Sequence, residues 1–167
     1  LDASWQSAGQ LVLPAQFEPW LISQGSLTAL LKSRCQAFRL ELVTEHWQAL
    51  PDFLQQQWQQ VEGLKRDVIL WCDGKACVYA QSWLPGQTIS TLRPLADLGE
   101  RPLGDYIFQH QSLHRGTIEA AQLDVMLTQL NIAARCYVRR SVFQLEGQPL
   151  LVADAFLPDI SKLEATL

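Results

Sequence analysis

The chain has 167 residues, of which 18% are charged and 48% hydrophobic, and its formal net charge is −4. This composition is that of an ordinary globular protein and excludes a disordered chain. The negative charge, without any basic stripe, argues against a nucleic-acid partner. No window approaches the roughly 18 apolar residues that cross a bilayer, and residues 1–10 lack the features of a signal peptide, so we expect a cytoplasmic protein without integral membrane association.

The first third of the chain predicts short helices followed by a strand. Residues 1–15 show no period and are expected to run over the surface. Two short helical pieces follow, one at 17–23 and one after Ser26, whose side chain is suited to cap a helix. Residues 37–48 then alternate between apolar and polar as a strand does. The glutamine-rich segment 55–60 predicts a solvated loop or a short helix.

Residues 61–84 predict a β-hairpin. The dipeptide Asp73-Gly74 lies between two apolar runs, where Asp-Gly is a strong hairpin signal. Because side chains alternate with period two along a strand, Arg66 falls in an otherwise apolar row next to Val68. A cation in such a row either reaches water from the strand end or has a functional role, and the pattern leaves both readings open.

The segment after this hairpin predicts two short helices and a strand. Residues 94–98 are helical and stop at Gly99, and a second helix is expected to open at the Pro-Leu-Gly sequence of 102–104. The first N–H groups of a helix have no intrahelical partner, so this start offers donors to an anion; a plain proline-initiated turn is the alternative. Residues 111–121 predict another strand, and 122–133 are ambiguous between helix and loop.

Residues 139–158 predict a second hairpin around the turn Glu146-Gly147. Asp154 lies on its second strand in an apolar row. Burying an ionised carboxylate costs several kcal/mol unless it is paired or hydrogen-bonded. The two-residue turn places Arg139 opposite Asp154, so a structural ion pair and a functional site both remain possible explanations.

The order of helices first, then strands joined by hairpins, predicts an α+β fold built on an antiparallel sheet, as a single domain over 1–167. The tail after residue 158 is expected to be frayed or loosely docked. The sequence contains no serine-hydrolase elbow, P-loop, dinucleotide fingerprint or zincin motif. His110 and His114 have a spacing compatible with a metal but lack acidic neighbours, and the cysteines lack paired short spacing. No metal site is therefore expected.

An arginine together with backbone N–H groups forms a receptor for a carboxylate, since the guanidinium fork matches two oxygens and helix starts add donors. Arg66 supplies the fork, and Leu27 and Leu103 are candidate backbone donors. Asp154, at the far end, is suited to hold a hydroxyl. The sequence therefore predicts a site for a small acid that carries a hydroxyl opposite its acid group.

Four stretches carry a resemblance to a known family: SLT at 26–28, KRDVILWCDG at 65–74, LGERPLGDYIF at 98–108 and RRSVFQLEGQPLLVADAFLP at 139–158. In this order they resemble the chorismate pyruvate-lyase family, whose members make 4-hydroxybenzoate at the start of ubiquinone synthesis. The resemblance assigns the family's carboxylate-binding arginine to Arg66 and its two backbone donors to Leu27 and Leu103. The family's essential glutamate, which meets the ring hydroxyl, aligns with Asp154. Aspartate is one methylene shorter, so its carboxylate is drawn back by roughly 1.5 Å.

The resemblance implies an antiparallel sheet of about six strands flanked by helices, with helical flaps near 20–35 and 92–108 over an enclosed ligand cavity. It implies a cofactor-independent lyase that converts chorismate to 4-hydroxybenzoate and pyruvate. Arg139, which the hairpin register places opposite Asp154, is expected to tune the charge of that residue. We expect a monomer. Two rival hypotheses remain: a non-catalytic module that binds a hydroxybenzoate-like molecule, as in effector domains of transcription regulators, and an inactive or altered-specificity family member, which the aspartate suggests.

Overall fold

The computed structural model describes residues 4–163, which form one antiparallel sheet of eight strands with helices against it. Seven strands follow the order β1-β6-β7-β8-β4-β3-β2, and β5 pairs with β7. Their bounds are Gln6–Ser7 (β1), Phe38–Ala49 (β2), Glu62–Cys72 (β3), Lys75–Pro85 (β4), His114–Arg115 (β5), Glu119–Leu127 (β6), Ile132–Leu145 (β7) and Gln148–Phe156 (β8). The fold is thus the expected α+β class.

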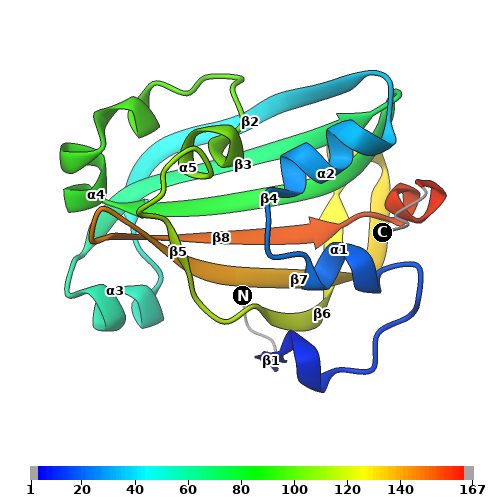
Figure 1. Cartoon of the computed structure of the whole chain (residues 1–167), viewed down its shortest axis with the longest axis horizontal. Coiled ribbons are helices and arrows are strands. Elements are labelled where there is room, and N and C mark those ends of the chain that lie inside the picture. The colour runs from blue at the N-terminus through cyan, green and yellow to red at the C-terminus, as the bar shows by residue number, and fades with distance from the viewer. Residues whose placement is uncertain (1–3, 164–167) are drawn as a thin grey trace.

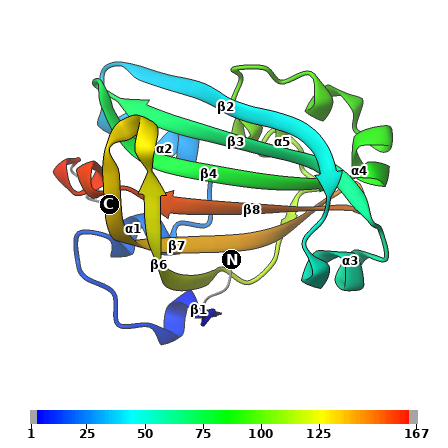
Figure 2. The same cartoon turned by 180° about the vertical axis from the view of Figure 1, so that it is seen from behind.

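Short helices connect the strands and cover the sheet. The α-helices among the described residues are α1 (Glu18–Ile22), α2 (Leu27–Arg34), α3 (Asp52–Trp58), α4 (Gly86–Thr91) and α5 (Leu103–Ile107). The 3-10 turns are η1 (Ala8–Gln10), η2 (Arg93–Ala96), η3 (Thr128–Leu130) and η4 (Pro158–Lys162). Figure 1 shows α1, α2 and α5 in front of one face of the sheet, and Figure 2 shows the opposite face from behind. None of the helices in residues 4–163 is long and apolar enough to cross a membrane.

Both faces of the central strands are buried. On the face beneath α2 and α5, Val68, Ala80 and Phe156 pack with the helix residue Leu31. On the opposite face, α3 packs through Leu54 and other side chains against Trp83, Leu151 and Ala153. Because apolar side chains fill both faces, a polar group on either of them needs a specific partner.

The two predicted hairpins are confirmed. Asp73 and Gly74 have φ of 51° and 78°, and Glu146 and Gly147 have φ of 51° and 76°. Positive φ at both central residues is the geometry of the two-residue turns that match strand twist. The predicted cap is also confirmed, since the Ser26 hydroxyl accepts a hydrogen bond from the Ala29 N–H at 3.1 Å.

Three expectations about the fold are wrong. The sheet has eight strands rather than about six, because β1 and β5 are only two residues long and such short pairings show no period. Residues 122–133, read as helix or loop, mostly continue β6 and begin β7. The described part of the predicted surface run, residues 4–15, does not simply cross the surface, since β1 pairs with β6 and Ala8 is buried. In each case pairing with a distant strand decides the conformation.

Three further segments match their predictions in part. Residues 55–60 overlap α3, so the short-helix alternative is correct there. The 94–98 segment is a 3-10 turn, and α4, which precedes it, was not predicted. The segment 158–163 is docked through Ile160, which is fully buried. Residues 1–3 and 164–167, which the predicted surface run and the predicted tail include, lie outside the described residues.

Candidate active site

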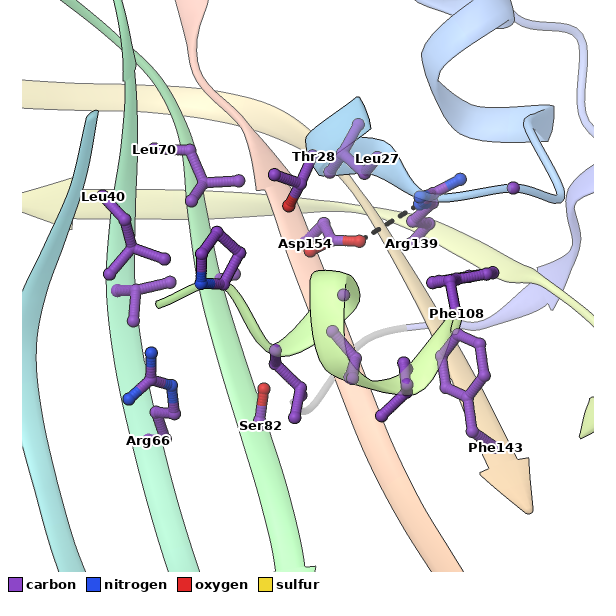
Figure 3. Close-up of a pocket in the computed structure, with 18 of the residues that line it drawn as sticks. Leu27, Thr28, Leu40, Arg66, Leu70, Ser82, Phe108, Arg139, Phe143 and Asp154 are labelled. Atoms are coloured by element: carbon purple, nitrogen blue, oxygen red, sulfur yellow. Dashed lines mark hydrogen bonds and ion pairs between the residues drawn. The ribbon is translucent and has the colours of Figure 1, made fainter. Parts of the chain in front are cut away.

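A pocket lies between the sheet and the starts of α2 and α5, and all four residues predicted for the site line it: Leu27, Arg66, Leu103 and Asp154. Figure 3 shows Arg66 and Asp154 on separate strands with apolar side chains between them. The apolar part of the wall comes from the sheet and from α5: Leu40, Val68, Leu70, Val152, Ile107 and Phe108. Such a mainly apolar cleft with few polar groups is typical of a small-molecule site.

Strand register explains why Arg66 and Asp154 face the same space. Arg66 pairs with Ser82 on β4, and Asp154 pairs with Ala80, which lies two residues before Ser82 on the same strand. Paired residues and residues two apart share a face, so both side chains project from one side of the sheet. With a strand spacing of roughly 4.8 Å and a rise of roughly 3.4 Å per residue, their Cα atoms are about 12 Å apart. This separation leaves room for a single six-membered ring between the two side chains.

Arg66 is almost fully buried and is held at two of its nitrogens. Nη1 donates to Glu45 Oε2 at 3.2 Å, and Nη2 donates to the Arg101 carbonyl oxygen at 2.9 Å. Burial lowers the pKa of Arg66, and the hydrogen bond and charge of Glu45 counteract this effect. The Arg101 carbonyl lies just before α5, so the guanidinium is oriented by the segment that leads into the flap.

Leu27 and Leu103 are the first residues of α2 and α5, respectively. No acceptor within residues 4–163 takes up either N–H, as expected for the first position of a helix. The two helix starts are in close contact, because a Cβ added to Gly104 would lie 3.3 Å from Ser26 Oγ and 3.5 Å from Thr28 Oγ1. The structure therefore brings both candidate donors to one edge of the pocket.

Asp154 makes the predicted cross-strand ion pair and also lines the pocket. Its Oδ2 lies 3.2 Å from Arg139 Nε, and both residues are at least 94% buried. Arg139 Nη1 donates to the carbonyl oxygens of Trp20 at 3.0 Å and Ser23 at 2.8 Å. The structural and the functional reading of Asp154 are therefore compatible, since Arg139 stabilises a carboxylate that still faces the cavity (Figure 3).

Sequence reasoning missed four polar side chains of this region. Thr28, Ser82 and Arg115 line the pocket, and Glu45 is the partner of Arg66. Thr28 lies in the recognised SLT stretch, which was the one available signal. Glu45 and Arg66 belong to strands joined through α3, and Arg115 lies on a two-residue strand, so no local period indicated either one.

Fold and pocket define an antiparallel α+β protein with a mainly apolar pocket between the sheet and the starts of two helices. A family model described as "Chorismate lyase" matches residues 1–165, and the chain belongs to the chorismate lyase family. It is 40% identical over 168 residues to a protein of Pseudoalteromonas translucida named "Probable chorismate pyruvate-lyase", covering 95% of this chain and 93% of that protein. A protein of the same name from Methylobacillus flagellatus is 35% identical, covering 88% and 89%.

Solved structures show a similar fold at low sequence identity. The effector domain of PhnF from Mycobacterium smegmatis superposes with a TM-score of 0.62 at 20% identity, covering 83% of this chain and 91% of that chain. The effector-binding domain of the trehalose repressor of Bacillus subtilis gives 0.55 at 11% identity, covering 72% and 91%. These similarities concern the fold alone, because one fold hosts many functions.

Proposed function

We propose that this chain is a cofactor-independent lyase that converts chorismate to 4-hydroxybenzoate and pyruvate, the first step of ubiquinone biosynthesis. The observation that carries the proposal is the convergence of Arg66, two unpaired helix-start N–H groups and Asp154 on one pocket. Membership of the chorismate lyase family supports the same reaction.

In the proposed complex the ring carboxylate binds at the Arg66 end. Arg66 has N–H groups left over after its bonds to Glu45 and the Arg101 carbonyl, and a guanidinium matches a carboxylate well. The N–H groups of Leu27 and Leu103 add two neutral donors. At the other end Asp154 accepts a hydrogen bond from the ring hydroxyl. A molecule with an acid group and a hydroxyl on opposite sides of one ring satisfies both ends.

The reaction consists of one proton transfer and the cleavage of one C–O bond. The carbon that bears the hydroxyl loses its proton, the C–O bond to the enolpyruvyl group breaks, and the ring becomes aromatic. The proton reaches the methylene carbon of the departing group, directly or by way of Asp154, and the group leaves as pyruvate. The protein orients the substrate and stabilises the shifting charge.

A second candidate is a binding module without catalysis. The similar folds of effector domains favour it, but their identities of 20% or less carry no information about the site. The names of relatives at up to 40% identity favour the lyase.

The test is to incubate the protein with chorismate and follow both products, 4-hydroxybenzoate by chromatography and pyruvate by a coupled reduction. We expect equal amounts of the two. Arg66→Gln should lower kcat/KM by about 10- to 100-fold or more, because a charge-assisted hydrogen bond contributes about 1.5–3 kcal/mol. Tight binding of 4-hydroxybenzoate without turnover would support the binding module instead. If the protein shows neither turnover nor binding, both proposals are refuted.

Arg140→Gln is the matched control for Arg66→Gln. Arg140 neighbours Arg139 on β7 but pairs with Glu119 at 3.0 Å and lies over the ring of Phe53 at 5.1 Å, away from the pocket. We expect kcat/KM of this variant to stay within threefold of the wild type.

A further inference from the structure

Arg115 is a partly buried arginine on the pocket wall, and no counter-ion for it lies among the described residues. Its Nε donates to Ser141 Oγ at 3.1 Å, and its Nη1 donates to the Gln24 carbonyl oxygen at 3.1 Å. Longer contacts of 3.4 Å reach the carbonyls of Ser23 and Gly25. Every one of these partners is neutral. Within residues 4–163 no carboxylate oxygen lies within 4 Å of its nitrogens, and its Nη2 has no acceptor.

This guanidinium lies at the Asp154 end of the pocket. Arg115 pairs with Phe143 across β5 and β7, and its guanidinium carbon is 4.9 Å from the centre of that ring. Both residues line the pocket together with Arg139 and Asp154. Arg115 also lines a groove on the outer surface, next to Ile22 and Gly116, so it separates the pocket from solvent.

The charges at this end do not balance. Two guanidinium groups, those of Arg115 and Arg139, accompany the single carboxylate of Asp154. The pKa of Arg115 is lowered to about 10, first by burial and then by nearby Arg139, while Asp154 counteracts both effects. Arg115 is therefore protonated at neutral pH. A charge removed from water without a counter-ion is unfavourable, and an arginine in this state that faces a cavity is suited to an anionic ligand.

The proposed substrate has an anionic group to place there. Chorismate carries a second carboxylate on its enolpyruvyl side chain, and that side chain is attached to the ring carbon beside the hydroxyl. If the hydroxyl meets Asp154, the enolpyruvyl group extends from the same end of the ring. We infer that Arg115 forms the subsite for the enolpyruvyl carboxylate, with Arg139 as the second cation of that subsite. This inference rests on the proposed function.

The subsite has a consequence for substrate and product. 4-Hydroxybenzoate keeps the ring carboxylate and the hydroxyl but lacks the second carboxylate, which leaves with pyruvate. Arg115 therefore adds affinity for the substrate and none for the aromatic product, whereas Arg66 binds both. This difference separates Arg115 from a residue that only maintains the pocket.

The experiment compares two ligands on three variants: Arg115→Gln, Arg66→Gln and the control Arg140→Gln. KM for chorismate is measured by turnover, and the dissociation constant of 4-hydroxybenzoate by calorimetry. We expect Arg115→Gln to raise KM by about 10- to 100-fold, the effect of one charge-assisted interaction, and to change product affinity by less than threefold. Arg66→Gln should weaken both ligands, and Arg140→Gln neither. Equal loss of both ligands in Arg115→Gln, or loss of neither, would overturn the subsite.

A conservative variant controls for the contacts of Arg115 with the carbonyls before α2. Arg115→Lys retains the positive charge but loses the fork, so part of the chorismate affinity should return relative to Arg115→Gln. An Arg115→Lys variant as weak as Arg115→Gln would contradict a role for the charge. Should the wild type convert no chorismate, the proposed function fails on that result alone. Direct calorimetric titration of chorismate and 4-hydroxybenzoate then still decides whether Arg115 recognises the second carboxylate.

Discussion

By the resemblance of its sequence, Asp154 is expected to stand where the family has a glutamate. The aspartate side chain is one methylene shorter than that of glutamate, and its Oδ2 lies 3.2 Å from Arg139 Nε. Arg139 is itself oriented by the carbonyls of Trp20 and Ser23. The short side chain is thus supported by a rigid set of donors and acceptors, which favours a preorganised carboxylate over a mobile one.

Asp154→Asn tests this role. Asparagine retains an acceptor for Arg139 but loses the negative charge, so we expect kcat to fall about 100-fold or more, as for removal of a general base. Removing one partner of a buried ion pair usually costs about 3–5 kcal/mol. We expect the free energy of unfolding of Asp154→Asn to fall by less than this. Turnover and urea unfolding measure the two effects. A kcat within threefold of the wild type would leave Asp154 with a structural role only.

At the scale of elements, the starts of α2 and α5 line the pocket, and we expect these helices to act as its two flaps. Their starts meet at Ser26, Thr28 and Gly104, and further along Lys32 Nζ lies 3.0 Å from Asp105 Oδ2. Both charged side chains are partly exposed to solvent, so this ion pair contributes little to stability. It is, however, the one ion pair within the described residues that joins the two flaps directly.

Reversing one charge of this pair should open the flaps. Asp105→Lys places two cations together, and we expect the dissociation rate of 4-hydroxybenzoate to rise about threefold or more, with a change in the free energy of unfolding below about 1 kcal/mol. The double variant Lys32→Asp, Asp105→Lys restores the attraction and should restore the rate. Stopped-flow fluorescence measures the dissociation rate. The measurement is made at low and at high salt, because salt screens an exposed pair. Equal rates for the single and the double variant would exclude this role.

For the whole molecule, the close approach of the sheet to the α3 segment depends on Gly63. A Cβ at this position would lie 2.4 Å from the Leu84 carbonyl oxygen and 2.9 Å from Leu50 Cδ2. The carbonyl belongs to the β3–β4 pair and cannot move without disturbing the ladder. The glycine therefore lets the strand pack against the buried segment that carries Leu50 and Leu54.

Gly63→Ala should lower stability without touching the pocket. We expect a loss of about 1–3 kcal/mol, the usual cost of overpacking, which corresponds to a Tm lower by about 3–10 °C for a domain of this size. Gly9→Ala is the control, because nothing lies within 4 Å of a Cβ added there. Differential scanning calorimetry compares the two variants. Similar Tm values would show that the Leu84 carbonyl can move aside.

The sequence by itself determined what depends on local chemistry. Two-residue turns at 73–74 and 146–147 follow from the glycines, and the second of them sets Arg139 opposite Asp154 by counting residues. The Ser26 cap follows from its hydroxyl. These features were predictable because each depends on a few neighbouring residues.

Only the tertiary structure decided which polar groups meet. The pairing of β3 with β4 skips Cys77, and this one-residue shift turns Ser82 to the face of Arg66, whereas an unbroken register would pair Arg66 with Gln81. A similar shift between Leu42 and Thr44 brings Glu45 opposite Arg66. Such shifts depend on packing between distant segments, and a slip of one residue exchanges the two faces of a strand. The position of Arg115 also depends on a distant segment, since the pairing of β5 with β7 brings it to the pocket.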